Sequence, residues 1–233
     1  MSDQDFRDMT YWKATRLNGT DFHTGTVDYA AALASGEPTP ALSGEGKFPG
    51  PGWYHLATVP TECVGMSWPC RLFEVEPDDD LGEDRPRGVY KVGATSVRVL
   101  REIDAYVALG PQGVQVAAFI ERCATLTEDD VARLGATRGA AQDAARDAGW
   151  AACATRSPAW GAARDAAWGA AWDITRDAAS WGATWGAVRG LLLRDLIGRY
   201  PGWDQDAYDL LTGPWRDAIG PIHPDDAPMA GSS

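Results

Sequence analysis

The side chains best suited to chemistry in the first half of the chain are two histidines, a tyrosine and a pair of carboxylates. Tyr54 and His55 are adjacent in the segment WYHLAT. If that segment is extended, their side chains point to opposite faces and only one of them can line a given cleft. Glu74 and Glu76 share one face of the segment RLFEVEP and could act in general acid–base chemistry, although a solvent-facing pair is the more common arrangement. His23 lies beside a turn in the segment DFHTG.

Several common chemistries lack their sequence motifs. The chain contains no GxSxG, no Walker loop, no HExxH and no dinucleotide-binding GxGxxG. Its four cysteines, Cys63, Cys70, Cys123 and Cys153, form no CxxC motif and do not cluster with histidines as a zinc site requires. We therefore expect no metal site, and we interpret the cysteines as thiols in a reducing compartment.

The charge balance limits the classes of partner. Lysine and arginine number 21 against 33 aspartates and glutamates, which gives a net charge of −12. Such an excess argues against a broad phosphate-binding surface, so we do not expect nucleic acid as a partner. The amino end lacks an apolar signal-peptide core, and no run of about 18 apolar residues occurs. We therefore expect no membrane partner and a cytoplasmic protein.

The first half, residues 1–125, has the composition of a β-rich domain. Glycine, proline and turn signals separate short apolar or alternating runs, which predict strands at 10–15, 52–59, 70–77 and 96–104. A short helix is expected within 26–34, and the apolar run 114–123 fits either a strand or a helix.

The second half has the composition of helices. Thr127 is followed by three acidic residues, which is typical of a helix N-terminus. A first helix can run to about Thr155, and Ser157 with Pro158 can begin a second that runs to about Arg199. We therefore predict an α+β protein, in which a helical hairpin at 126–200 follows the β-domain and residues 201–233 form short helices and a disordered tail.

Tryptophans are spaced four apart in the alanine-rich second helix. Trp168 and Trp172 form one pair, and Trp181 and Trp185 form another on a different face of the helix. One explanation is that all of them pack inside the protein. The other is that they form an interface with a protein partner or a second copy of the chain, since tryptophan is favoured at such interfaces.

Four segments, taken in order, carry a resemblance to a known fold. They are YWKATR, WYHLATV, RLFEVEPDDDLGEDRP and VYKVGATSVRVLREIDAYVAL, and together they cover less than half of the chain. Their order resembles that of the ADP-ribosyltransferase fold, in particular the small rifamycin ADP-ribosyltransferases. The whole chain, with its opening turn and Ala/Trp-rich tail, also looks like uncharacterised proteins encoded by phages of actinobacteria, which would place it in the host cytoplasm.

The transferase resemblance implies NAD as cofactor and a role for each of several residues. Lys13 and His55 would contact NAD, Tyr54 would stack on its nicotinamide, and Asp84 would polarise the ribose. Lys13 stands where that family has a histidine, and His23 could take the place of that histidine in space. Because lysine does not reproduce the geometry of an imidazole, the resemblance favours a scaffold with little or no activity.

Three functions remain open at this point. The first is a non-catalytic or weakly active protein that acts through protein interaction or self-assembly of its Trp/Ala helices. The second is an NAD-dependent ADP-ribosyltransferase. The third is the binding or sequestration of an ADP-ribose-type nucleotide.

Overall fold

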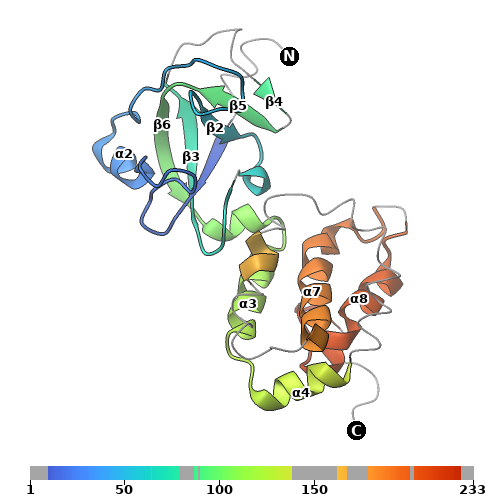
Figure 1. Cartoon of the computed structure of the whole chain (residues 1–233). Helices are drawn as coiled ribbons and strands as arrows, with labels where there is room; N and C mark the ends of the chain where they lie inside the picture. The colour runs from blue at the N-terminus through green and yellow to red at the C-terminus, as the bar shows by residue number, and fades with distance from the viewer. Residues whose placement is uncertain are drawn as a thin grey trace. The chain divides into compact units, whose positions relative to one another are not determined.

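The computed structural model describes residues 10–63, 65–78, 87–88, 90–137, 162–166, 178–199 and 202–226. The chain forms two compact units, Met1–Ala108 and Leu109–Ser233. Both strands and helices are present, as expected for an α+β protein (Figure 1). None of the helices in the described ranges has the length and apolar character needed to cross a membrane.

Unit 1 is built on one antiparallel sheet. In the order β4-β5-β2-β1-β3-β6, its strands are β4 (Arg87–Gly88), β5 (Lys91–Ala94), β2 (Tyr54–Ala57), β1 (Tyr11–Thr15), β3 (Arg71–Pro77) and β6 (Val97–Ile103). The four strands expected from sequence are confirmed as β1, β2, β3 and β6. The short strands β4 and β5 were not anticipated separately.

A short helix and the sheet enclose the core of unit 1. Helix α2 (Tyr29–Ser35) begins at Asp28, whose side chain accepts a hydrogen bond from the Ala31 N–H, as an N-cap does. Its first residue, Tyr29, is fully buried and lies stacked on Phe73 and edge-on to Tyr54, with both ring centroids 6.5 Å away. Around these rings are the inward residues of five strands, Tyr11, Leu56, Val75, Val92, Ala94, Val97 and Val99.

Unit 2 is helical. Its elements are α3 (Gly113–Cys123), α4 (Glu128–Ala136), α7 (Ala178–Leu193), η5 (Arg194–Leu196) and α8 (Gln205–Ala218), and the 3-10 turn η3 (Ala105–Leu109) leads into it. The ambiguous run 114–123 is therefore a helix. Thr127 begins α4 with a capping box, as its sequence predicts, because its hydroxyl and the Asp130 carboxylate each bond the other's backbone N–H.

Helix α7 forms the centre of unit 2 and contacts α3, α4 and α8 (Figure 1). Two glycines of α7 allow α8 to approach it closely. A Cβ on Gly186 would lie 2.5 Å from the Leu211 carbonyl oxygen, and a Cβ on Gly190 would lie 2.2 Å from the Thr212 methyl group. The predicted hairpin is tested only in part. Residues 162–166 are helical and α7 ends at Leu193 before η5, but most of the segment between α4 and α7 lies outside the described residues.

The segment after α8 is held by one buried carboxylate. Asp226 accepts hydrogen bonds from the Tyr208 hydroxyl at 2.8 Å and from the Ile222 and His223 N–H groups at 2.9 and 3.0 Å. The guanidinium of Arg194 lies 3.2 Å from the same carboxylate. This cluster attaches the chain after α8 to the helices before it, so the tail region as far as residue 226 is folded.

Candidate functional site

Strand β1 is paired unequally with its two neighbours in the sheet. It pairs with β3 at all five of its residues, but with β2 only at Trp12 and Ala57. Buried backbone groups beyond that pair need partners other than a neighbouring strand.

Side chains of Lys13 and Cys63 supply these partners. The Lys13 Nζ donates to the His55 carbonyl oxygen at 3.4 Å, and the Ala14 N–H bonds to Cys63. Burial raises the pKa of the Cys63 thiol to about 12, so this thiol stays protonated. The ammonium of Lys13 also lies 5.6 Å from the centre of the Tyr29 ring, and burial lowers its pKa. The basic residue of β1 therefore faces the core of unit 1.

The carboxylate that acts on Lys13, Asp21, has a structural role. Asp21 is 5% exposed and accepts from the Thr24 N–H at 2.6 Å, the Thr24 hydroxyl at 2.8 Å and the Thr26 and Val27 N–H groups at 3.1 Å. Burial alone would raise its pKa, but these hydrogen bonds outweigh burial and lower it to about 2. Asp21 therefore shapes the turn that follows β1 as a permanent carboxylate.

Tyr54 and His55 lie on opposite faces of β2, as their alternation predicts. Tyr54 is 5% exposed, and its hydroxyl donates to the Pro40 carbonyl oxygen at 2.7 Å. The His55 ring is half-buried, with Nε2 3.3 Å from the Gly50 oxygen and the ring centre 5.1 Å from that of Phe48. Burial lowers the pKa of His55. Both side chains are therefore engaged with the loop that precedes β2.

The remaining predicted residues do not join this group. His23 is exposed in the turn after β1, and Asp84 lies outside the described residues. Glu74 is ion-paired with Arg101 at 2.6 Å and Glu76 lies 3.8 Å from Arg98, which fits a pair of carboxylates facing solvent. The described parts of the chain contain no group of His, Cys, Asp or Glu that could hold a metal ion.

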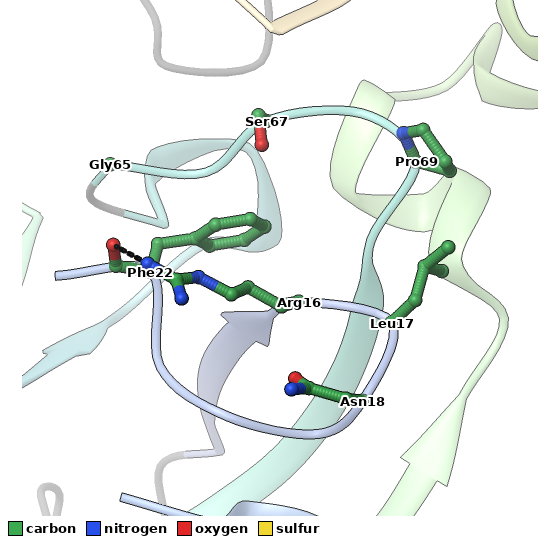
Figure 2. Close-up of a pocket in the computed structure, with 7 residues that line it drawn as sticks. All are labelled: Arg16, Leu17, Asn18, Phe22, Gly65, Ser67 and Pro69. Carbon is green, nitrogen blue, oxygen red and sulfur yellow. Dashed lines mark hydrogen bonds between the residues drawn. The ribbon is translucent and has the colours of Figure 1, made fainter. Parts of the chain in front are cut away.

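An open pocket of about 630 Å³ lies at the end of β1. It is lined by two loops of unit 1, with Arg16, Leu17, Asn18 and Phe22 on one and Gly65, Ser67 and Pro69 on the other. Figure 2 shows the Phe22 ring lying between Arg16 and the loop that carries Ser67.

The guanidinium of Arg16 makes one hydrogen bond at this pocket. Its Nη2 donates to the Phe22 carbonyl oxygen at 3.2 Å, which is the dashed line in Figure 2. Gly25 has a φ of +71°, and a Cβ there would lie 2.7 Å from the Arg16 Nη1. The glycine is thus required both by its backbone conformation and by the passing guanidinium. A planar cation, an aromatic ring and two small polar side chains together suit a planar anionic ligand.

Sequence reasoning did not identify Arg16 or Phe22. The usable signal was the turn LNGTD directly after the first predicted strand, which places the flanking side chains at the end of a sheet. Comparison of the chain with protein-family models, with curated proteins and with solved structures finds no match.

The tryptophan pairs are described only in part. Trp168 and Trp172 lie outside the described residues, as does the side chain of Trp181. Trp185 is half-buried in α7, and the guanidinium carbon of Arg189 lies 4.8 Å from its ring centre. Arg189 is 1% exposed, and its Nε and Nη2 atoms are buried with no hydrogen-bond partner among the described residues.

Proposed function

We propose that this protein binds an anionic ligand of the nucleotide type without transforming it, on an ADP-ribosyltransferase-like scaffold formed by unit 1. The observation that carries this proposal is the pocket at the end of β1. There, the Arg16 guanidinium is bonded to the Phe22 carbonyl oxygen, and the Phe22 ring, Asn18 and Ser67 also line the pocket. Arginine binds phosphate through two parallel N–H groups, and an aromatic ring offers a surface on which a base can stack.

We propose that the ligand is not transformed, because the side chains near β1 that could act as acids or bases already have structural roles. Asp21 accepts four hydrogen bonds within its own turn, the Tyr54 hydroxyl is bonded to the Pro40 oxygen, and His55 packs against Phe48. A group already committed to the fold is poorly placed to transfer protons to a substrate. The NAD-dependent transferase therefore stands as the alternative, and it depends on an acid such as Asp84.

Thermal unfolding with ligand tests the proposal. The full chain is heated alone, with ADP-ribose and with NAD at millimolar concentration, while nicotinamide release is followed in the NAD samples. A ligand present at a hundredfold excess over its Kd stabilises a protein by about 2.7 kcal/mol, which is readily measured. We expect stabilisation without nicotinamide release, and we expect Arg16→Gln to abolish most of it.

Arg101→Gln is the matched control, because it removes the same charge from an exposed position on β6 of the same unit. Loss of stabilisation in both variants would mean that net charge and not the pocket governs binding. Nicotinamide release by the unmodified protein would establish the transferase instead. If neither nucleotide changes the unfolding temperature, the nucleotide proposal is abandoned.

Protein interaction through α7 is the second candidate. It is favoured by the tryptophan pairs of the sequence, of which the described part of the chain contains the Trp185 side chain, half-buried on α7. Light scattering over a hundredfold range of protein concentration tests self-assembly, and a constant monomer mass would leave only a different protein as partner.

A further inference from the structure

The segment after α8 meets the start of α3 through one histidine. The His223 side chain is 9% exposed, and its Nε2 atom lies 3.1 Å from the Gln112 Oε1 atom. Its Nδ1 atom lies 3.1 Å from the backbone nitrogen of Asp225, whose N–H can only donate. Gln112 directly precedes α3, but its side chain does not cap that helix. The imidazole therefore joins two parts of unit 2 that are 111 residues apart in the chain.

These contacts fix which ring nitrogen carries the hydrogen. The Gln112 Nε2 atom donates to the Asp195 Oδ1 atom at 2.7 Å, and a carboxylate can only accept. The Gln112 oxygen therefore faces the histidine and needs a donor, so the His223 Nε2 atom carries the hydrogen. On the other side of the ring, Nδ1 carries none because it accepts from the Asp225 N–H. His223 is thus bound as a neutral imidazole with both nitrogens in use.

The groups that face the ring oppose a second proton on balance. Burial is the largest cause of a lowered pKa of His223, and the Arg194 guanidinium on η5 lowers this pKa further. The carboxylates of Asp225, Asp226 and Asp195 act in the opposite direction without reversing the shift. The Asp225 carboxylate lies 3.5 Å from Nδ1, but its side chain is 76% exposed. A proton on Nδ1 would also meet the Asp225 N–H, so that two donors would face each other.

Helices α3 and α8 hold the same segment by contacts that do not depend on this proton. From α3, Arg122 donates to two carbonyl oxygens in the segment 219–221, at 2.7 Å in both bonds. From α8, the Tyr208 hydroxyl donates to Asp226 at 2.8 Å, and the Arg216 guanidinium lies 3.8 Å from the same carboxylate. Arginine stays charged in proteins, and the lowered pKa of Asp226 keeps it ionised. The histidine is therefore the contact that changes in mildly acidic solution.

We propose that His223 is a pH-sensitive latch, which closes the segment 222–226 on the start of α3 while the imidazole is neutral and opens when Nδ1 takes up a proton. Opening brings the ring into water, where a histidine has a pKa of about 6.5. The open form therefore binds the proton more tightly than the closed form. Closure is at full strength above about pH 6.5, and it weakens as the pH falls from there to the lower pKa of the closed form. The latch lies in unit 2 and does not depend on a ligand at the Arg16 pocket.

Nitrogen-15 NMR of the histidine rings in the full chain tests the closed geometry. We expect the ring shifts of His223 at pH 7.5 to be those of the tautomer protonated at Nε2. Its titration midpoint should lie below that of the same residue in urea. His223→Gln identifies the signal, because the chain has only three histidines. The tautomer protonated at Nδ1, or a midpoint in the folded chain at or above that in urea, overturns the proposal.

Hydrogen exchange, measured by NMR at individual amides, tests the opening. The reporters are the N–H groups of Ile222, His223 and Asp225, which are bonded inside the closed segment. Their protection, corrected for the intrinsic effect of pH, should fall several-fold from pH 7.5 to 5.5. The fall cannot exceed about tenfold per pH unit, because one proton is taken up. Protection equal to that at the centre of α8 would mean that the segment opens only with the whole unit, which overturns the latch.

Two matched substitutions assign the effect to His223. His223→Gln keeps an N–H that can bond to Gln112 but takes up no proton, so protection of the Ile222 amide should be nearly the same at pH 7.5 and 5.5. His23→Gln makes the same change at an exposed position in unit 1, and it should keep the pH dependence of the wild type. A pH dependence that persists in His223→Gln, or that is absent from the wild type, overturns the proposal.

Discussion

Asp21→Asn tests the turn that follows β1, which carries four of the residues that line the pocket. The Asp21 carboxylate accepts two hydrogen bonds from Thr24, through its N–H and its hydroxyl. It accepts one more from each of the N–H groups of Thr26 and Val27. A carboxyl with a pKa of about 2 instead of 3.8 contributes about 2 kcal/mol of stability at neutral pH. Asparagine has one acceptor oxygen, and its NH₂ group would face N–H donors. We therefore expect unit 1 to lose about 2 kcal/mol or slightly more.

The effect has a definite pH dependence. Because the folded protein lowers the pKa of Asp21, the unfolded chain takes up its proton first as the pH falls. The contribution of Asp21 to the free energy of unfolding is thus fully present above about pH 5. About half of it is lost by pH 3, and it disappears below pH 2. The difference between the wild type and Asp21→Asn should narrow over the same interval.

Two buried thiols report on unit 1 directly. Cys63 and Cys70 are 3% and 4% exposed, so a pulse of 4,4′-dithiodipyridine labels them only after unit 1 unfolds in urea. Asp28→Asn is the matched control. It makes the same change in the same unit at the N-cap of α2, where asparagine is as good as aspartate, and it should cost almost nothing. Equal urea midpoints for Asp21→Asn and Asp28→Asn at pH 7 would refute the reasoning.

Two further predictions concern unit 2. Asp226→Asn removes the buried carboxylate that Arg194 and Arg216 face and weakens the acceptor of two backbone N–H groups, so we expect a loss of about 3 kcal/mol together with faster hydrogen exchange in the peptide that follows α8. Since hydrogen bonds outweigh burial and lower the pKa of Asp226, this contribution should also be lost as the pH falls below about 4. Gly190→Ala places a methyl group against Thr212 and Tyr208, and it should cost about 1–3 kcal/mol in urea unfolding, whereas Gly213→Ala, which meets nothing within 4 Å, should be neutral or stabilising.

Local patterns were sufficient to predict the elements of this fold. The alternation of Leu72, Glu74 and Glu76 against Phe73 and Val75 indicates a strand, and Thr127 with its acidic first turn indicates where α4 begins. The run at 114–123 was ambiguous because valine and phenylalanine favour strands while its length also suits a helix. Contacts distant in sequence decide it, such as the packing of Phe119 on Trp215 with ring centres 4.6 Å apart.

The candidate site depends on relations that one sequence does not contain. The Lys13 amine bonds to the His55 carbonyl oxygen, 42 residues later in the chain, on a strand that pairs with β1 at one residue only. The Ala14 N–H of the same strand bonds to Cys63, which follows that second strand in the chain. A resemblance of segments can place Lys13 on the first strand, but only the register of the strands determines what the amine contacts.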